Sequence, residues 1–226
     1  MLIHVPEVLD AAQTVHVRET LQAAEWSDGR ETVGPQGARV KRNQQLPDAS
    51  STRRELGAIV LEALARNSLY HAATLPQKTL PPRFNRYQGG EQYGFHVDGS
   101  IMAMPDNAGQ LRSDIACSLF LNEPDAYDGG ELVISDTYGE HEVKLPAGDL
   151  VVYPASSLHR VTPVTRGTRL AAFFWVQSLI RDDAQRRMLF ELDASIRQLD
   201  TGDTGRAVTL QLTAVYHNLL RMWAQT

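Results

Sequence analysis

Short strand patterns separated by glycine turns run from Leu80 to Leu179, and they constrain the fold more than any other feature of the sequence. The turns fall at 89–90, 129–130, 147–148 and 166–167, with short apolar or alternating segments between them. Regularly spaced short strands with such turns are typical of two packed antiparallel sheets. The sequence therefore predicts a β-sandwich or jelly roll in this region.

The residues before this region show two helical patterns. Asp10 and Gln13 can cap a first helix, and Thr52-Arg53-Arg54-Glu55 has the pattern of a capping box before a second, amphipathic helix. Residues 26–45 are rich in glycine and polar side chains and are expected to form strands joined by turns, with the basic run at 39–42 as a solvated edge. We expect the two helices to cover one outer face of a sheet.

The residues after this region show two further apolar stripes at helical spacing, joined by a linker at 201–205. The stripes consist of Met188, Leu189, Leu192, Ile196 and Leu199, and of Leu212, Val215, Tyr216, Leu219, Leu220 and Trp223. These helices are expected either to form a contact between two copies of the chain or a lid, or to pack on the sandwich of their own subunit. The chain thus divides into supporting N-terminal elements (1–79), a core (80–179) and a C-terminal helical extension (180–226).

Two histidines and one aspartate, His96, Asp98 and His159, form the strongest candidate site. His-x-Asp alone is weak evidence, because 7 histidines and 27 acidic residues give about one His-x-acid match by chance. However, residues 93–98 have the pattern of a strand, in which alternate side chains share a face. Two histidines and one carboxylate are the ligands of non-haem Fe(II) oxygenases, which leave one face of the metal open. We therefore predict an iron site, with His159 supplied from the boundary of a later strand.

Arg169 lies in an otherwise apolar segment, 168–176, ten residues after His159. An arginine in a core-like strand needs an anionic partner, because an unpaired buried charge is costly. The partner is either a carboxylate of the protein or a carboxylate of a keto-acid co-substrate, which suits the planar guanidinium. The neighbouring metal-ligand candidates favour the keto acid. Trp175, six residues later on the same face, is expected to form a wall of the co-substrate pocket.

Composition excludes several classes of partner. The net charge of −5 provides no basic excess for nucleic acid. The single cysteine, Cys117, rules out an internal disulfide, fits a reducing compartment and is expected to be a small core residue. Residues 1–6 lack the pattern of a signal peptide, and no apolar run has the length of a membrane span. We expect a soluble, cytoplasmic protein with no membrane partner.

Several segments can now be compared with known families: Phe84-Asn85-Arg86-Tyr87, Tyr93-Gly94-Phe95-His96-Val97-Asp98-Gly99, Asp128-Gly129-Gly130-Glu131-Leu132, Pro146-Ala147-Gly148-Asp149, and Ser157 through Arg169 to Trp175. Together they resemble the Fe(II)- and 2-oxoglutarate-dependent dioxygenase domain of the prolyl/lysyl hydroxylase type. The match extends into both flanks, and the whole chain resembles the bacterial PKHD-type hydroxylases associated with iron uptake.

This resemblance implies an α+β fold, a double-stranded β-helix (jelly roll) with supporting N-terminal helices and a C-terminal helical extension. It implies Fe(II) bound by His96, Asp98 and His159, 2-oxoglutarate anchored by Arg169, O2 as the second co-substrate and L-ascorbate as reductant. The substrate would be a peptidyl prolyl or lysyl side chain or a small molecule, with a role in iron homeostasis. Tyr87, or else Tyr93, would donate its hydroxyl to the co-substrate carboxylate; aromatic core packing is the alternative for both. No catalytic residue is expected beyond the metal ligands.

Two other functions compete with this interpretation. A cupin-like metalloenzyme that does not use 2-oxoglutarate could recruit His141 as a third histidine ligand, but it would not need Arg169. A jelly roll that senses iron without turnover would be free to lose either the three ligands or the arginine. The combination of all four residues favours the hydroxylase.

Overall fold

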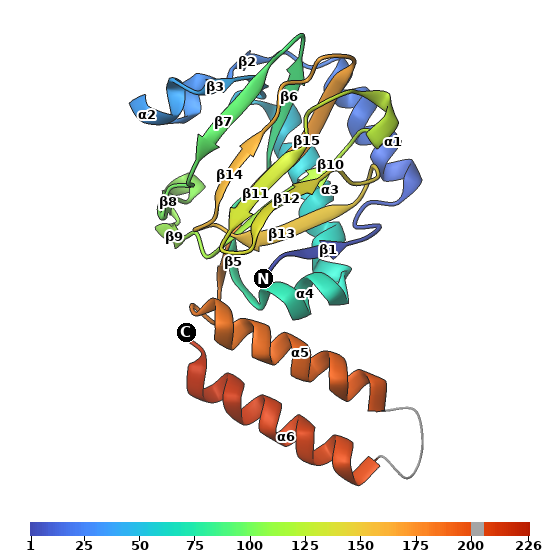
Figure 1. The fold of residues 1–226 in the computed structure, drawn as a ribbon, viewed down its shortest axis with the longest axis vertical. Helices are drawn as coiled ribbons and strands as arrows, with labels where there is room; N and C mark the ends of the chain where they lie inside the picture. Colours follow the sequence, from blue (N-terminus) through green and yellow to red (C-terminus); the bar gives the residue numbers. More distant parts are fainter. Residues whose placement is uncertain (200–205) are drawn as a thin grey trace.

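Two antiparallel sheets, packed face to face, form the body of the computed structural model, which describes residues 1–199 and 206–226 (Figure 1). The strand order is β1-β13-β10-β15-β6-β4-β2 in the larger sheet, with β5 beside β15, and β12-β11-β14-β7-β3 in the smaller sheet. A separate hairpin pairs β8 with β9. This arrangement confirms the predicted α+β jelly roll.

The strands of the larger sheet are β1 (Ile3–Val5), β2 (Ser27–Asp28), β4 (Gln44–Gln45), β5 (Pro76–Thr79), β6 (Arg83–Gln88), β10 (Ile115–Phe120), β13 (Leu150–Pro154) and β15 (Thr168–Ser178). Those of the smaller sheet are β3 (Lys41–Arg42), β7 (Gln92–His96), β11 (Leu132–Asp136), β12 (Gly139–Val143) and β14 (Leu158–Val161). The hairpin strands are β8 (Ile101–Ala103) and β9 (Gln110–Arg112), and short 3-10 turns lie at Pro105–Asn107 and Pro124–Ala126.

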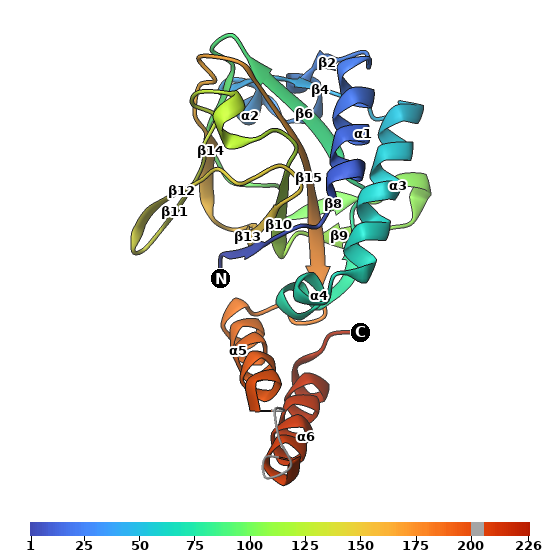
Figure 2. The same ribbon diagram turned by 90° about the vertical axis from the view of Figure 1, so that its right-hand side faces the viewer.

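Helices α1 (Ala11–Gln22) and α3 (Ser51–Arg66) cover the outer face of the larger sheet, as predicted, and α4 (Ser68–Thr74) follows them (Figure 2). Asp10 and Gln13 form the predicted capping box of α1. The predicted cap of α3 at Thr52 is wrong: Ser50 caps the helix, because its hydroxyl accepts a hydrogen bond from the Arg53 amide across 3.3 Å. Three consecutive residues, Ser50, Ser51 and Thr52, are all good capping types, so the sequence alone does not distinguish them.

Strand β10 at the centre of the larger sheet is buried on both faces. Ile115, Cys117 and Leu119 pack toward the helices, whereas Ala116 and Phe120 pack into the core between the sheets. Cys117 is free and buried, so it is the small core residue that the alternation predicts.

The segment 26–45 is less regular than predicted, because a 3-10 turn (Gly29–Thr32) and a one-turn helix, α2 (Pro35–Ala38), accompany its strands. Strand β3 pairs with β7 of the smaller sheet, and β4 pairs with β6 of the larger sheet. The segment therefore bridges the two sheets. The expected solvated edge is only partly present: Arg39 and Arg42 are exposed, but Lys41 is 3% exposed because its side chain points between the sheets.

The C-terminal helices α5 (Asp183–Leu199) and α6 (Arg206–Trp223) pack against each other and project from one end of the body (Figures 1 and 2). The start of α5 holds them there: Asp183 pairs with the N-terminal amino group across 2.7 Å, and Leu189 is fully buried. No side chain of α6 is buried in the part of the chain that the structure describes. The predicted linker at 201–205 lies outside the described residues. Among those residues, no helix has both the length and the apolar character of a membrane span.

Candidate active site

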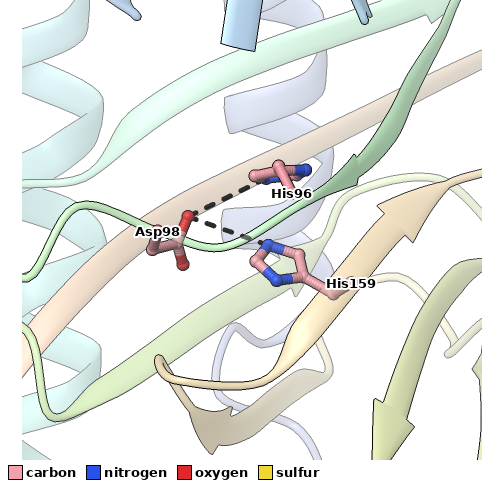
Figure 3. A group of neighbouring side chains, drawn as sticks. All are labelled: His96, Asp98 and His159. Atoms are coloured by element: carbon pink, nitrogen blue, oxygen red, sulfur yellow. Dashed lines mark ion pairs between the residues drawn. The ribbon is translucent and has the colours of Figure 1, made fainter. Parts of the chain in front are cut away.

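The structure brings His96, Asp98 and His159 together between the sheets (Figure 3). His96 on β7 lies directly opposite His159 on the neighbouring strand β14. Asp98 was predicted to share a strand face with His96, but β7 ends at His96 and the loop that follows carries Asp98. The available ligand atoms of the three residues all lie within 4.8 Å of one another. A jelly-roll strand pair and one loop thus assemble a compact group of three donors.

Hydrogen bonds to backbone carbonyls fix the orientation of both imidazole rings. Nδ1 of His96 lies 2.9 Å from the Gly94 carbonyl oxygen, and Nδ1 of His159 lies 3.0 Å from that of Ser157. A carbonyl only accepts, so each Nδ1 carries the proton and each Nε2 keeps its lone pair for a metal. The two Nε2 atoms lie 3.8 and 3.7 Å from Oδ1 of Asp98, the contacts marked in Figure 3.

Aromatic residues contact and orient each of the three donor side chains. The indole Nε1 of Trp175 donates a hydrogen bond to Oδ2 of Asp98 across 2.9 Å, which leaves Oδ1 free. The Tyr93 ring stacks on the His96 ring, with 3.5 Å between centroids, and Tyr153 contacts His159 edge-on. Trp175 therefore does more than form the predicted pocket wall, because it also orients the carboxylate.

The electrostatics of the three residues suit a bound cation. Burial, reinforced by His159, lowers the pKa of His96 to about 3, so this imidazole is neutral. Burial also raises the pKa of Asp98. A divalent metal between these groups would supply the positive charge that keeps the carboxylate ionised beside the neutral imidazole. Two nitrogens and one oxygen on one side of a point form the donor set of a facial triad, so the residues present fit Fe(II).

Arg169 lies on β15, opposite Tyr87 on β6, and is 1% exposed. Its Nη1 donates a long hydrogen bond, 3.5 Å, to Oδ1 of Asn85, and its guanidinium carbon lies 5.2 Å from the centre of the Phe120 ring. Among the described residues Arg169 forms no ion pair, and its buried Nε has no hydrogen-bond partner. The alternative of an internal salt bridge is therefore not what the structure shows.

The three metal-ligand candidates and Arg169 with its neighbours line one small inner chamber. His96, Asp98, His159, Arg169, Tyr87 and Trp175 all line it, and so do Tyr93 and the two residues Lys41 and Asn43, which sequence reasoning missed. Tyr87 is 1% exposed and lies under the guanidinium of Arg169, whereas Tyr93 lies at the histidines. Burial raises the pKa of Tyr87 to about 12, so its hydroxyl keeps its proton.

Gly130 explains the Asp128-Gly129-Gly130 motif, because it gives Arg169 room. Its φ of +70° lies in the left-handed region that favours glycine. A Cβ on Gly130 would lie 3.0 Å from Cδ of Arg169 and 2.9 Å from side-chain atoms of Tyr127 and Val164. Any larger residue would therefore crowd Tyr127, Val164 and Arg169, in a backbone conformation that side chains disfavour.

An outer groove of about 980 Å³ leads from solvent to two of the three donors, His96 and Asp98. Its lining includes the exposed apolar side chains of Val40, Phe95, Val97 and Leu158. It also includes two arginines, Arg39 and Arg83, but Asp98 is its only carboxylate among the described residues. The groove therefore presents an apolar, weakly cationic surface to an incoming molecule.

His141, the third histidine that a cupin would need, lies away from the three donors. It was expected in a surface turn but lies on the exposed edge strand β12, where Nε2 contacts Asp136 across 3.1 Å. The structure thus offers two histidines and one carboxylate, and not three histidines.

Comparisons with known proteins define the class. The profile of the 2OG-Fe(II) oxygenase superfamily matches residues 82–177, and the profile of the PKHD-type hydroxylase C-terminal domain matches residues 183–225. A PKHD-type hydroxylase of Stenotrophomonas maltophilia (strain R551-3) is 65% identical over 226 residues, which cover 100% of both chains. The chain therefore belongs to the PKHD-type hydroxylases.

Solved structures show the same fold at low sequence identity. A prolyl hydroxylase from Trichoplax adhaerens, solved with a peptide of hypoxia inducible factor, aligns with a TM-score of 0.56 and 17% identity over 83% of this chain and 86% of that one. A prolyl-4-hydroxylase from Pseudomonas putida aligns with a TM-score of 0.51 and 22% identity, over 78% of this chain and 92% of that one. Family membership makes the protein a 2-oxoglutarate-dependent hydroxylase, an oxidoreductase that uses Fe(II), 2-oxoglutarate and O2.

Proposed function

We propose that His96, Asp98 and His159 hold Fe(II) and that Arg169 anchors the distal carboxylate of 2-oxoglutarate in the inner chamber. One observation carries the proposal: three convergent donors and one buried, unpaired guanidinium line the same enclosed space. When bound, Fe(II) with 2-oxoglutarate and O2 supplies the oxidant that hydroxylates a substrate C–H bond.

The side chains around the chamber fix the geometry and exclude water. The carbonyls of Gly94 and Ser157 keep Nδ1 of each histidine protonated, and Trp175 keeps one carboxylate oxygen of Asp98 occupied. The two-pronged guanidinium of Arg169 would orient the co-substrate, with the protonated Tyr87 hydroxyl as a further donor. No protein group needs to move a proton, so we assign no general acid or base.

The substrate enters through the outer groove. The apolar side chains at its rim favour a substrate with an apolar segment next to the hydroxylated position, such as a prolyl or lysyl side chain within a peptide. A small molecule of matching polarity is the alternative, since the groove volume lies near the upper end for small-molecule sites, roughly 300–1,000 Å³.

The resemblance to the hydroxylase family supports two further parts of the proposal. L-ascorbate would sustain turnover by returning oxidised iron to Fe(II), and the physiological role would lie in iron homeostasis. The free, buried Cys117 suits a reducing compartment, so we place the protein in the cytoplasm. The exposed apolar side chains of α6 support a homodimer.

Succinate formation from 2-oxoglutarate tests the proposal. The purified protein should form succinate only when Fe(II), O2 and 2-oxoglutarate are all present. Asp98→Ala and Arg169→Ala should abolish or strongly reduce it, whereas the matched control His141→Ala, which removes an exposed histidine, should not. Full activity in Asp98→Ala, or activity without 2-oxoglutarate, would favour the cupin-like alternative.

A further inference from the structure

A strip of three buried polar side chains, Lys41, Asn43 and Gln45, lies beside the inner chamber. Alternate side chains of residues 41–45 point inward, so these three are 3%, 4% and 1% exposed, while Arg42 is exposed and Gln44 half-buried. Lys41 and Asn43 line the chamber. Because β3 belongs to one sheet and β4 to the other, the polar strip crosses from sheet to sheet.

The polar strip runs along the line that joins the metal ligands to Arg169. At one end, Lys41 lies opposite Tyr93, and its ammonium is 5.2 Å from the centre of the ring that stacks on His96. At the other end, Gln45 lies opposite Asn85, which accepts the hydrogen bond of Arg169.

The middle of the polar strip lies next to the co-substrate side of the chamber. The Asn43 side chain is beside the Tyr87 hydroxyl, but its amide atoms form no hydrogen bond with it. Tyr87 in turn lies under the guanidinium of Arg169. Lys41 and Asn43, the two residues of the polar strip that line the chamber, therefore lie between the metal ligands and Arg169.

Several polar atoms of the strip lack partners in the part of the chain that the structure describes. Both amide atoms of Asn43, which lines the chamber, are buried without a hydrogen bond, and so is Nε2 of Gln45, which is not among the lining residues. Buried polar groups in folded proteins are nearly always paired, so unpaired groups that line a chamber indicate a ligand or ordered water.

The ammonium of Lys41 likewise has no partner of opposite charge. Its ammonium donates to Oε1 of Gln45 and, across 3.1 Å, to Oγ1 of Thr32, but it forms no ion pair with any carboxylate of the described residues. Lys41 and Arg169 are thus two buried cations in one chamber, one near each end, and neither forms an ion pair with a carboxylate of the described residues. Unpaired buried charge is costly, so the chamber is suited to a dianion with one carboxylate at each end.

We propose that the polar strip completes the co-substrate site: Lys41 binds the carboxylate of 2-oxoglutarate nearest the metal, and Asn43 donates an amide N–H to the same molecule. Gln45 and Thr32 are positioning residues, because they hold the ammonium of Lys41 and do not reach the co-substrate themselves. This inference rests on the proposed function, in which Arg169 takes the distal carboxylate.

Calorimetric titration of the Fe(II)-loaded protein without O2 tests the inference independently of turnover. 2-Oxoglutarate and 2-oxobutyrate share the 2-oxo acid end, but only 2-oxoglutarate has a distal carboxylate. Lys41→Met should weaken the binding of both ligands by about 10- to 100-fold, the effect expected for loss of a buried charged hydrogen bond. Arg169→Ala should lower the affinity for 2-oxoglutarate and leave the affinity for 2-oxobutyrate unchanged. Asn43→Ala should weaken the binding of both ligands. This smaller substitution replaces Lys41→Met as the test if that variant does not fold.

Arg42→Met is the matched control, because it removes a positive charge from the neighbouring, outward-facing residue. It should bind both ligands like the wild type. If Lys41→Met and Asn43→Ala also bind 2-oxoglutarate like the wild type while Arg169→Ala does not, the inference is overturned and the proposed function stands. A loss in Lys41→Met that is confined to 2-oxoglutarate would overturn the assignment of Lys41 to the metal end. A wild-type protein that binds no 2-oxoglutarate would instead overturn the proposed function.

Discussion

The indole N–H of Trp175 donates a hydrogen bond to Oδ2 of Asp98 across 2.9 Å. Trp175 and Arg169 lie on the same strand, β15, which is the longest strand of the larger sheet and is paired on both sides. One rigid strand therefore carries both the residue that orients a candidate metal ligand and the residue proposed to anchor the co-substrate. We therefore expect metal geometry and co-substrate position to be coupled through its backbone.

Trp175→Phe should lower the affinity for Fe(II) by roughly 10- to 100-fold, because loss of an outer partner frees the carboxylate to rotate. The aromatic ring would still fill its place in the core, so the thermal unfolding midpoint should change little. Anaerobic metal titration measures the effect. Trp223→Phe in α6 is the control, and equal metal affinity in Trp175→Phe and the control would show that the hydrogen bond does not position Asp98.

Arg169→Lys should raise the concentration of 2-oxoglutarate needed for half-maximal succinate formation by about 10-fold or more. Lysine keeps the charge but loses the two-pronged geometry and reaches less far. Metal affinity, measured in the same preparations, should not change. An unaltered requirement for 2-oxoglutarate in Arg169→Ala would remove Arg169 from the site.

Strand alternation and the spacing of glycine turns were sufficient to predict a β-sandwich or jelly roll, since these patterns depend on residues adjacent in sequence. The family resemblance then favoured the jelly roll. The same local patterns put His96 on a strand and Arg169 inside a buried one. They did not reveal the hydrogen bond from Trp175 to Asp98, because Asp98 lies in the loop after β7 and its direction depends on a distant strand.

The polar strip escaped sequence reasoning for a similar reason. Strands β3 and β4 are two residues long each, and they pair with strands of different sheets. Nothing local distinguishes the buried Lys41 from the exposed Arg42 in a basic run; only the register against β7 and β6 does.

The affinity for 2-oxoglutarate should depend on pH through Lys41. Burial, reinforced by Arg83 and opposed by Asp98 and Asp28, lowers the pKa of Lys41 to about 8. Below this pH the ammonium is charged and can bind a carboxylate, and above it the charge is lost. Anaerobic titrations should therefore give level affinity below about pH 8 and a decline above it. Lys41→Met should bind 2-oxoglutarate weakly at every pH, without that decline. An identical decline in this variant would show that a group other than Lys41 causes it.

The full-length protein should sediment as a homodimer. Val208, Val215 and Met222 on α6 are 50%, 48% and 74% exposed and recur every seven residues, so they share one helix face, and a contiguous exposed apolar face marks an interface. Replacing all three with glutamine should give a monomer with unchanged secondary structure. The same change made at exposed Val15 on α1 is the control. A wild-type protein that is monomeric at micromolar concentrations would contradict the dimer.

The central claim is that His96, Asp98 and His159 together hold the iron. A crystal structure of the Fe(II)-loaded protein, with anomalous diffraction recorded at the iron absorption edge, tests it most directly. We predict one strong anomalous peak between Nε2 of the two histidines and Oδ1 of Asp98, about 2.0–2.2 Å from each by analogy with the nitrogen and oxygen ligands of zinc, and no such peak in Asp98→Ala. A peak elsewhere, or a coordination sphere without His159, would contradict the account.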